Sequence, residues 1–320
     1  MKGNDEKIVY LNGRFVPESE AKIPWRSTGF FLGTCVFDTM RTVQKKRVFR
    51  LEDHIERLFN SLRYIEEDPG ISPKEMGQIV MEVAERNAHL LADDEELDIS
   101  AYVTAGVVSG NMYEWERGPP EVIVGGAVFS LSTYAKYYKE GTHVVVASTR
   151  IPPPQCLDPK IKNTNRLFSH IAELETAKVD LEPHFTLMLD IYGNIAEFTA
   201  ANLFVVSKGT LITPPTRNVL GGISRKVVLE LAEELDIPAF ERDIQLYHLY
   251  NANEAFQTAS SYCIFPISCV NKRQLWKDIP GPITKSLLDA YSEELGVDIL
   301  GEAESLYNQS NFARSYPEIE

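Results

Sequence analysis

Apolar residues recur along the first third of the chain with the periods of short strands and amphipathic helices. Residues 8–11 and 14–16 flank Asn12-Gly13, a dipeptide typical of a tight hairpin turn between two strands. Residues 53–65 carry isoleucine, leucine and phenylalanine at helical spacing, so one side of this segment is apolar. The pattern therefore predicts a hairpin followed by a helix.

A second helix is expected over residues 72–91, because Ser72 precedes Pro73 at the first helical position. Two strands are expected after it, over residues 98–108 and 121–131. Strands and helices alternate in this part of the chain, which predicts a mixed α/β (α+β) fold.

A polar, tyrosine-rich stretch over residues 132–141 interrupts the apolar pattern. We place a domain boundary there, between a smaller N-terminal α/β domain (residues 1–135) and a larger C-terminal domain (residues 136–320). After the boundary the pattern predicts a strand at 142–148, a helix with Leu167, Ile171 and Leu174 on its core face, strands within 185–213, a helix at 224–235 with Ser224 as N-cap, a helix at 284–295 and a loosely held acidic tail.

Composition limits the classes of function. The 320 residues carry a formal net charge of −14, which argues against a nucleic-acid partner. The four cysteines form no CxxC pair and the six histidines show no ligand spacing, so neither a metal site nor a disulfide framework is expected. The N-terminus lacks an apolar export signal and no apolar run is long enough for a membrane span. We therefore expect a soluble, cytoplasmic protein.

Two residues offer the chemistry that pyridoxal 5′-phosphate requires from a protein. Lys162 lies between the rigid segment Pro152-Pro153-Pro154 and a predicted helix, and its amine can form a Schiff base. Glu197 lies where a predicted strand turns, and a carboxylate there can hold a protonated ring nitrogen. Lys160 competes for the role of the amine.

The chain also offers groups that bind phosphate. A glycine pair, Gly221-Gly222, opens directly onto a predicted helix, whose first backbone N–H groups and dipole suit an anion. A small hydroxyl-bearing turn and an arginine on the helix at 53–65 add further donors. The candidate phosphate ligands are Arg57, Gly222, Ile223, Ser224, Ser260 and Ser261.

In order and spacing, these motifs resemble the class IV aminotransferases, the fold type IV group of pyridoxal phosphate enzymes, over nearly the whole chain. Residues 33–41 resemble the family's GxxxF(E/D)xxR block, and residues 54–58 resemble its HxxRL helix. The other matches are Lys162 with Asn165 to KxxN, residues 197–204 to ExxxxN(L/I/V)F, and residues 222–225 to G(I/V)(T/S)R.

The resemblance implies a two-domain fold with the cofactor in the interdomain cleft, a C-terminal cofactor-binding domain and an active homodimer. It implies that Lys162 is the Schiff-base lysine and proton shuttle and that Glu197, beside Asn202, pairs with the ring nitrogen. The implied phosphate ligands are Arg57, the amides of Ile223 and Ser224, and Ser261. Arg166 departs from the branched-chain members, which have tyrosine there, and resembles the aminodeoxychorismate lyases.

The substrate positions leave several family members open. Thr39 and Thr104 stand where branched-chain members have glycine and arginine, and they resemble (R)-selective amine transaminases. Loss of that arginine would remove a charge-assisted bond to the α-carboxylate worth about 1.5–3 kcal/mol. We therefore expect an (R)-selective amine:2-oxo acid transaminase working by ping-pong transamination. The alternatives are a branched-chain aminotransferase, an aminodeoxychorismate lyase-like enzyme and a D-amino acid transaminase.

A 2-oxo acid acceptor also needs a cation, for which Arg41 and Arg117 are candidates. A protein that binds the cofactor without turnover belongs to another class of function and predicts the loss of a key group, yet Lys162 and Glu197 are both present. The expected substrate-binding residues are Phe37, Thr39, Arg41, Tyr102, Thr104 and Arg117.

Overall fold

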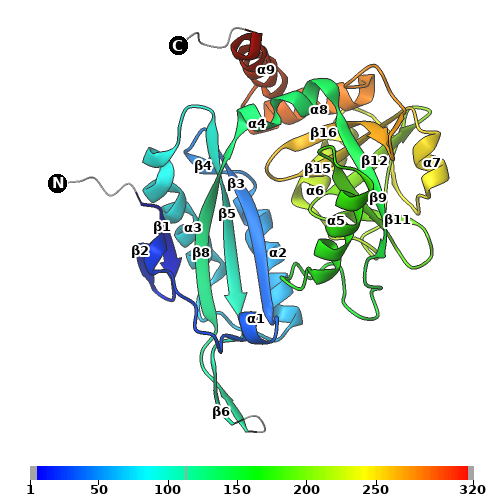
Figure 1. Ribbon diagram of the computed structural model, residues 1–320. Helices are drawn as coiled ribbons and strands as arrows, with labels where there is room; N and C mark the ends of the chain where they lie inside the picture. The colour runs from blue at the N-terminus through cyan, green and yellow to red at the C-terminus, as the bar shows by residue number, and fades with distance from the viewer. Residues whose placement is uncertain (1–5, 112–113, 316–320) are drawn as a thin grey trace. The chain divides into compact units, whose positions relative to one another are not determined.

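The computed structural model describes residues 6–111 and 114–315, and contacts within the chain divide it into two compact units (Figure 1). Unit 1 comprises Met1–Phe129 and Ile161–Arg166, and unit 2 comprises Ser130–Lys160 and Leu167–Glu320. The sequence-based division at residue 135 stays a prediction of domains. The units differ from it in two segments. Residues 130–135 belong to unit 2, and Ile161–Arg166, which carries Lys162, belongs by its contacts to unit 1.

Unit 1 is built on a six-stranded sheet in the order β2-β1-β8-β5-β3-β4. Helices α2 and α3 pack against each other, α2 on β3 and α3 on β1 and β5, so both cover the same face of this sheet (Figure 1). In chain order its elements are β1 (Ile8–Leu11), β2 (Arg14–Pro17), η1 (Glu18–Glu20), α1 (Thr28–Phe31), β3 (Cys35–Val43), β4 (Arg47–Val48), α2 (Leu51–Tyr64), α3 (Pro73–Asn87), η2 (Ala88–Leu90), β5 (Glu95–Thr104), β6 (Val108–Gly110), β7 (Trp115–Arg117) and β8 (Glu121–Ser130).

The expected hairpin, both expected helices and both expected strands are present in unit 1. Strands β1 and β2 pair in antiparallel fashion across the turn at Asn12-Gly13, where both residues have positive φ. Ser72 caps α3 in a reciprocal capping box with Glu75 and precedes proline at the first helical position. The first expected strand ends earlier than predicted, because β5 stops at Thr104.

Unit 2 is built on a nine-stranded sheet in which β11-β10-β9-β16-β15-β12-β13-β14 are hydrogen-bonded neighbours and β17 pairs with β16. Helix α5 packs on β9 and β10, whereas α6 and α8 pack on each other and on β15. In chain order its elements are α4 (Leu131–Glu140), β9 (Thr142–Arg150), α5 (Leu167–Val179), β10 (Phe185–Leu189), β11 (Ile195–Phe198), β12 (Asn202–Ser207), β13 (Thr210–Thr213), α6 (Ile223–Glu234), β14 (Ala239–Glu241), α7 (Leu246–Tyr250), β15 (Glu254–Ala259), β16 (Cys263–Val270), β17 (Arg273–Gln274), α8 (Pro282–Leu295) and α9 (Ile299–Ser315).

The prediction for the apolar side of α5 was wrong. Leu167, Ile171 and Leu174 are 70%, 47% and 49% exposed. The buried residues of this helix are small: Ser169, Ala172 and Thr176. Small side chains let this helix pack closely on its sheet. The side of α5 that faces the sheet therefore carries small residues, and its larger apolar residues lie on the exposed side.

The polar stretch at 132–141, where we placed the domain boundary, is mostly helical, because it forms most of α4, which buries Ala135 and Tyr138. Two further expectations need correction. Gly222, not Ser224, is the N-cap of α6, so Ser224 lies inside the first turn. The C-terminal tail is helical up to residue 315, and α9 buries Ile299 and Ala303.

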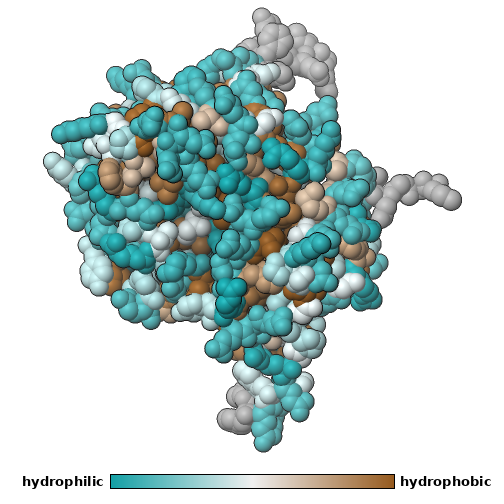
Figure 2. All heavy atoms as spheres, turned by 180° about the vertical axis from the view of Figure 1, so that it is seen from behind, coloured by the Kyte–Doolittle hydropathy of each residue, from teal (hydrophilic) through white to brown (hydrophobic). Residues whose placement is uncertain are grey.

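The surface shown in Figure 2 is mainly hydrophilic, and hydrophobic residues appear in patches between the hydrophilic ones. Within residues 6–111 and 114–315, none of the helices has both the length and the apolar character needed to traverse a bilayer. In the same part of the chain, no three histidine, cysteine or acidic side chains are grouped to hold a metal ion.

Candidate active site

The pleat of β3 sorts the predicted site residues of unit 1 into two faces. Phe37, Thr39 and Arg41 alternate with buried neighbours, so they share one face of the strand. Their cross-strand partners on β5 are Tyr102, Ser100 and Asp98 respectively. Of the expected substrate residues, five therefore lie on this face: Phe37, Thr39, Arg41, Tyr102 and Thr104.

An aromatic pair forms the centre of this face. The rings of Phe37 and Tyr102 stack with centroids 5.3 Å apart and an interplanar angle of 14°. The Nζ atom of Lys162 lies 4.7 Å from the centre of the Phe37 ring. The amine predicted to react is thus beside an apolar, aromatic wall.

Backbone hydrogen bonds to β3 hold the segment that carries Lys162. The N–H of Phe37 donates to the carbonyl of Lys162 at 2.9 Å, and Thr164 N–H donates to the carbonyl of Cys35 at 3.1 Å. Lys162 N–H donates to Ser61 Oγ at 3.3 Å. Lys162 is partly buried, whereas the competing Lys160 is exposed and pairs with Asp158 at 2.8 Å. Its partial burial beside the substrate residues favours Lys162 over the exposed, ion-paired Lys160 as the reactive amine.

The opposite face of β3 carries a buried carboxylate, Asp38. Its oxygens accept hydrogen bonds from Nε and Nη2 of Arg57, both at 2.8 Å, and Oδ1 also contacts His54 Nδ1 at 2.7 Å. Neither Asp38 nor His54 was given a role from the sequence. The HxxR spacing could have indicated that His54 and Arg57 contact a common partner, since residues three apart share one side of a helix.

The pKa directions follow from this cluster. Burial would raise the pKa of Asp38, but the Arg57 guanidinium, His54 and their hydrogen bonds hold it well below its usual range, so the carboxylate is charged. Burial lowers the pKa of His54, and the charges of Arg57 and Lys162 act in the same direction while Asp38 opposes them. His54 is therefore neutral at neutral pH, and its Nδ1 must carry the hydrogen, because a carboxylate only accepts.

The two threonines that suggested an amine substrate are both hydrogen-bonded. Thr39 Oγ1 and Ser100 Oγ are 2.8 Å apart across the strands. Thr104 Oγ1 donates to the buried Glu121 carboxylate at 2.9 Å and accepts from the N–H of Gly106 at 3.1 Å. Thr104 thus satisfies a buried acid.

The two candidate carboxylate-binding arginines are placed differently. Arg41 is buried, donates from Nε to the carbonyl of Thr42 at 3.0 Å and lies over the Phe129 ring. Arg117 lies in β7, is more than half exposed and forms an ion pair with Glu67. Arg41 is on the same face as Phe37, so the structure brings only Arg41 together with the other substrate candidates.

In unit 2, Glu197 lies in β11 and is oriented by Asn202, the first residue of β12, and by the loop before α6. Its Oε2 accepts from Asn202 Nδ2 at 3.2 Å and from the N–H of Leu220 at 3.1 Å. Asn202 Nδ2 also donates to the carbonyl of Leu220 at 3.0 Å. The carboxylate is therefore fixed by the same loop that leads into α6.

The first turn of α6 is the expected anion site. Gly222 is its N-cap, and Ile223 and Ser224 are both buried in the first turn. The first N–H groups of a helix have no acceptor within the helix, so they point toward any anion at its end. A Cβ added to Gly222 would lie 2.1 Å from Asn202 Oδ1, so only glycine fits this close approach. Ser260 and Ser261 form the partly buried turn between β15 and β16.

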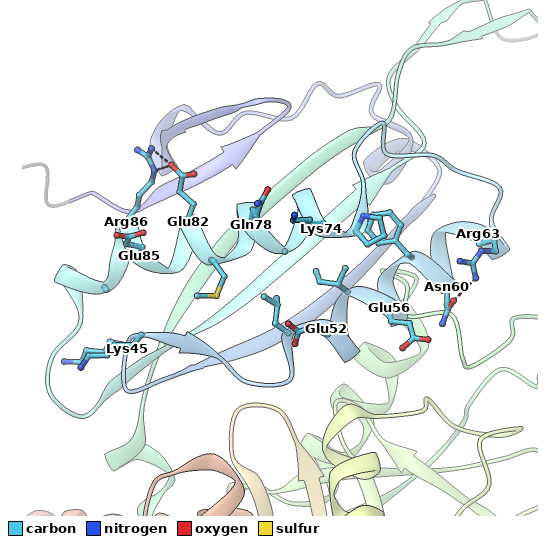
Figure 3. Close-up of a pocket in the computed structure, with 18 residues that line it drawn as sticks. Lys45, Glu52, Glu56, Asn60, Arg63, Lys74, Gln78, Glu82, Glu85 and Arg86 are labelled. Atoms are coloured by element: carbon cyan, nitrogen blue, oxygen red, sulfur yellow. Dashed lines mark hydrogen bonds and ion pairs between the residues drawn. The ribbon is translucent and has the colours of Figure 1, made fainter.

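A separate groove of about 1360 Å³ lies between the outer sides of α2 and α3 (Figure 3). Many of its lining residues are charged, and Glu56, Asn60 and Arg63 line it from α2. None of the predicted site residues lines it, so this groove is not the candidate active site.

The donors in the two units match the groups of pyridoxal phosphate. A partly buried amine suits its aldehyde, a fixed carboxylate suits its ring nitrogen, and a held guanidinium with helix N–H groups suits its phosphate. The close approach of Gly222 to Asn202 excludes a side chain at the N-cap of α6, so the first N–H groups of this helix stay uncovered by a Cβ there. The residues present therefore fit this cofactor.

Comparison with known proteins supports this assignment. Residues 35–270 match the family model for amino-transferase class IV. A putative branched-chain-amino-acid aminotransferase of Methanocaldococcus jannaschii is 30% identical over 286 residues, which cover 89% of this chain and 95% of the relative.

Solved structures give the same result. A branched-chain aminotransferase from Thermoproteus uzoniensis, solved with norvaline, is 30% identical with a TM-score of 0.77 and covers 91% of this chain and 95% of its own. A branched-chain amino acid aminotransferase from Thermobaculum terrenum, solved in its PLP form, is 26% identical with a TM-score of 0.76 and covers 95% and 97%. The resemblance and the fold class predicted from the motifs are confirmed. The chain belongs to the class IV aminotransferases, enzymes of fold type IV that use pyridoxal 5′-phosphate.

Proposed function

We propose that this aminotransferase moves an amino group between a branched-chain or similar hydrophobic amino acid and a 2-oxo acid. The observation that carries the proposal is the stacked pair of Phe37 and Tyr102 beside the Lys162 amine. Aromatic surface next to the reacting group favours an aliphatic substrate side chain, because burying that side chain removes apolar area from water. The relatives described above bear branched-chain aminotransferase names, which supports the same substrate class.

The proposed roles follow from the chemistry of each group. When bound, pyridoxal phosphate supplies an aldehyde for the amine and a ring that accepts the electron pair released at the substrate carbon. Lys162 would bind the aldehyde and, once released, would carry a proton between the substrate carbon and C4′ of the cofactor, acting as general base and acid. Glu197 holds the proton on the ring nitrogen, and Asn202 keeps its carboxylate in place. Arg57, the first turn of α6 (Gly222, Ile223 and Ser224), Ser260 and Ser261 hold the phosphate.

A second candidate is the (R)-selective amine:2-oxo acid transaminase expected from sequence. It is favoured by Thr104, which offers a neutral side chain bonded to Glu121 where an arginine would attract an α-carboxylate. The comparisons do not favour this substrate over branched-chain amino acids. For either candidate, Arg41 is the arginine on the substrate face that would bind the carboxylate of the 2-oxo acid, and Arg117 is the alternative.

We also propose that the active unit is a homodimer. Unit 1 exposes a cluster of aromatic side chains in which the Phe31 ring contacts the rings of Trp25 and Trp115 at 5.9 Å and 6.0 Å. Phe30 beside them is 78% exposed. Exposed aromatic patches of this kind mark protein interfaces, and a second copy of the chain would cover this one.

Substrate class is tested by the absorbance of the holoenzyme mixed separately with L-leucine, (R)-1-phenylethylamine and D-alanine. We expect L-leucine to bleach the visible band of the bound cofactor, because the Phe37–Tyr102 wall accommodates its side chain. Bleaching by the chiral amine alone would replace the proposal with the second candidate. Bleaching by D-alanine alone would exclude both.

The cofactor role of the α6 turn is tested by Gly222→Ala, with Gly221→Ala as matched control. A Cβ at Gly222 would displace Asn202, which holds Glu197, whereas at Gly221 the nearest atom is 3.8 Å away. We expect Gly222→Ala to lose about 1–3 kcal/mol of unfolding free energy and to bind pyridoxal phosphate more weakly. Gly221→Ala should match the wild type in both denaturant titration and cofactor titration. Equal cofactor affinity in the two variants would contradict the assignment.

Dimerisation is tested by sedimentation velocity of the holoenzyme. Phe30→Glu should shift the protein toward the monomer, because it places a charge within the aromatic cluster. Tyr247→Glu, which changes an exposed aromatic residue on α7, should remain dimeric. A wild-type protein that sediments as a monomer at all concentrations would refute the homodimer.

A further inference from the structure

We propose that Asp38 is a positioning residue for the cofactor phosphate: a buried carboxylate that holds the Arg57 guanidinium in place and is itself held by His54. The inference rests on the proposed function, in which Arg57 binds the phosphate. Asp38 is not proposed to touch the phosphate itself. It acts through Arg57.

The bond pattern between Asp38 and Arg57 fixes the plane of the guanidinium. Nε reaches Oδ2 and Nη2 reaches Oδ1, each at 2.8 Å, so the pair is bidentate. Two parallel bonds specify orientation as well as distance, which a single bond would not. A guanidinium has five N–H donors, so the two that Asp38 receives hold the group while others point away from the carboxylate.

His54 holds the carboxylate from the other side. His54 and Arg57 are three residues apart on α2, so both reach the same strand. The neutral imidazole donates from Nδ1 to Oδ1 at 2.7 Å and adds no charge to the pair. Asp38 and His54 are both almost completely buried, so water has little access to compete for this hydrogen bond. The carboxylate therefore cannot rotate away from Arg57 without leaving a buried donor unsatisfied.

The same elements also hold the backbone of Lys162. Ser61 lies one turn after Arg57 on α2; its Oγ donates to the Arg57 carbonyl at 3.1 Å and accepts the Lys162 N–H at 3.3 Å. Phe37, the neighbour of Asp38 on β3, donates its N–H to the Lys162 carbonyl. Strand β3 and helix α2 thus set the position of the guanidinium relative to the amine. A loose Arg57 would lose this fixed spacing.

Two opposed effects make the proposal testable. Removing the Asp38 charge would take away a negative charge beside the Arg57 guanidinium, and this change by itself would strengthen the attraction of the guanidinium for phosphate. Removing the bidentate acceptor would release the guanidinium into several rotamers, which weakens phosphate binding. If Asp38 is a positioning residue, the second effect is larger and affinity falls. If charge alone matters, affinity rises.

The opposite side of α2 supplies a matched control. Glu56 precedes Arg57 in sequence, but it is exposed and lines the groove beside α2 (Figure 3). Glu56→Gln makes the same acid-to-amide change as Asp38→Asn without touching the Arg57 pair. Any effect specific to Asp38→Asn therefore reports the buried carboxylate.

The experiment measures the affinity of the apoprotein for pyridoxal phosphate and for pyridoxal, which lacks the phosphate, by titration of protein fluorescence. Asp38→Asn should weaken binding of pyridoxal phosphate by about tenfold and leave pyridoxal binding within about twofold. Arg57→Ala should show the same selective loss, and the double variant should lose no more than Arg57→Ala. Glu56→Gln should bind both ligands as the wild type does.

The outcomes separate the inference from the proposed function. If Arg57→Ala loses phosphate-dependent affinity while Asp38→Asn binds as tightly as the wild type or more tightly, the positioning role is refuted and the role of Arg57 stands. If Arg57→Ala binds both ligands normally, the phosphate role of Arg57 is refuted and the inference falls with it.

A second pair of variants covers the case in which Asp38→Asn does not fold, as judged by circular dichroism. His54→Asn keeps an N–H donor near the position of Nδ1, whereas His54→Leu removes it. The positioning role then requires His54→Leu to lose affinity for pyridoxal phosphate selectively and His54→Asn to recover most of it. Equal phosphate-dependent affinity in these two variants would overturn the proposal.

Discussion

The hydrogen bond between the Phe37 N–H and the Lys162 carbonyl connects the two parts of the sequence on which unit 1 depends. It joins the edge of β3 to a segment more than a hundred residues later in the chain. Because side chains alternate along a strand, β3 then presents Phe37 on the side of the Lys162 amine and Asp38 on the side of Arg57. One strand thereby separates substrate contacts from the support of the proposed phosphate ligand.

In unit 2, a single side chain likewise supports two proposed cofactor contacts. Asn202 donates to Glu197 and to the loop before α6, and its side chain excludes any residue but glycine at the N-cap of that helix. The proposed ring-nitrogen contact at Glu197 and the proposed phosphate site at Gly222 therefore both depend on the position of the Asn202 side chain. A substitution that moves this side chain is expected to affect both.

Much of the family assignment was available from sequence, because motif residues such as Lys162 and Glu197 are set by chemistry that any fold of the family must satisfy. Helix α2 followed from its apolar period, and the capping box of α3 from local residues. The role of Asp38 could not be predicted, since its partners are 16 and 19 residues away and become neighbours only when α2 packs on β3. The outward stripe of α5 misled the prediction because periodicity shows that one side is apolar but does not show what covers it. The hydrogen bond from Thr104 to Glu121 was equally hidden, since it joins residues on separate strands.

Every proposed role in the reaction requires that Lys162 is the amine that binds the cofactor. Reduction of the holoenzyme with borohydride, followed by peptide mapping, tests it directly, because the reduced bond between lysine and cofactor survives digestion. We expect the label on Lys162 alone. A label on Lys160, which is exposed and paired with Asp158, or on any other lysine would contradict it.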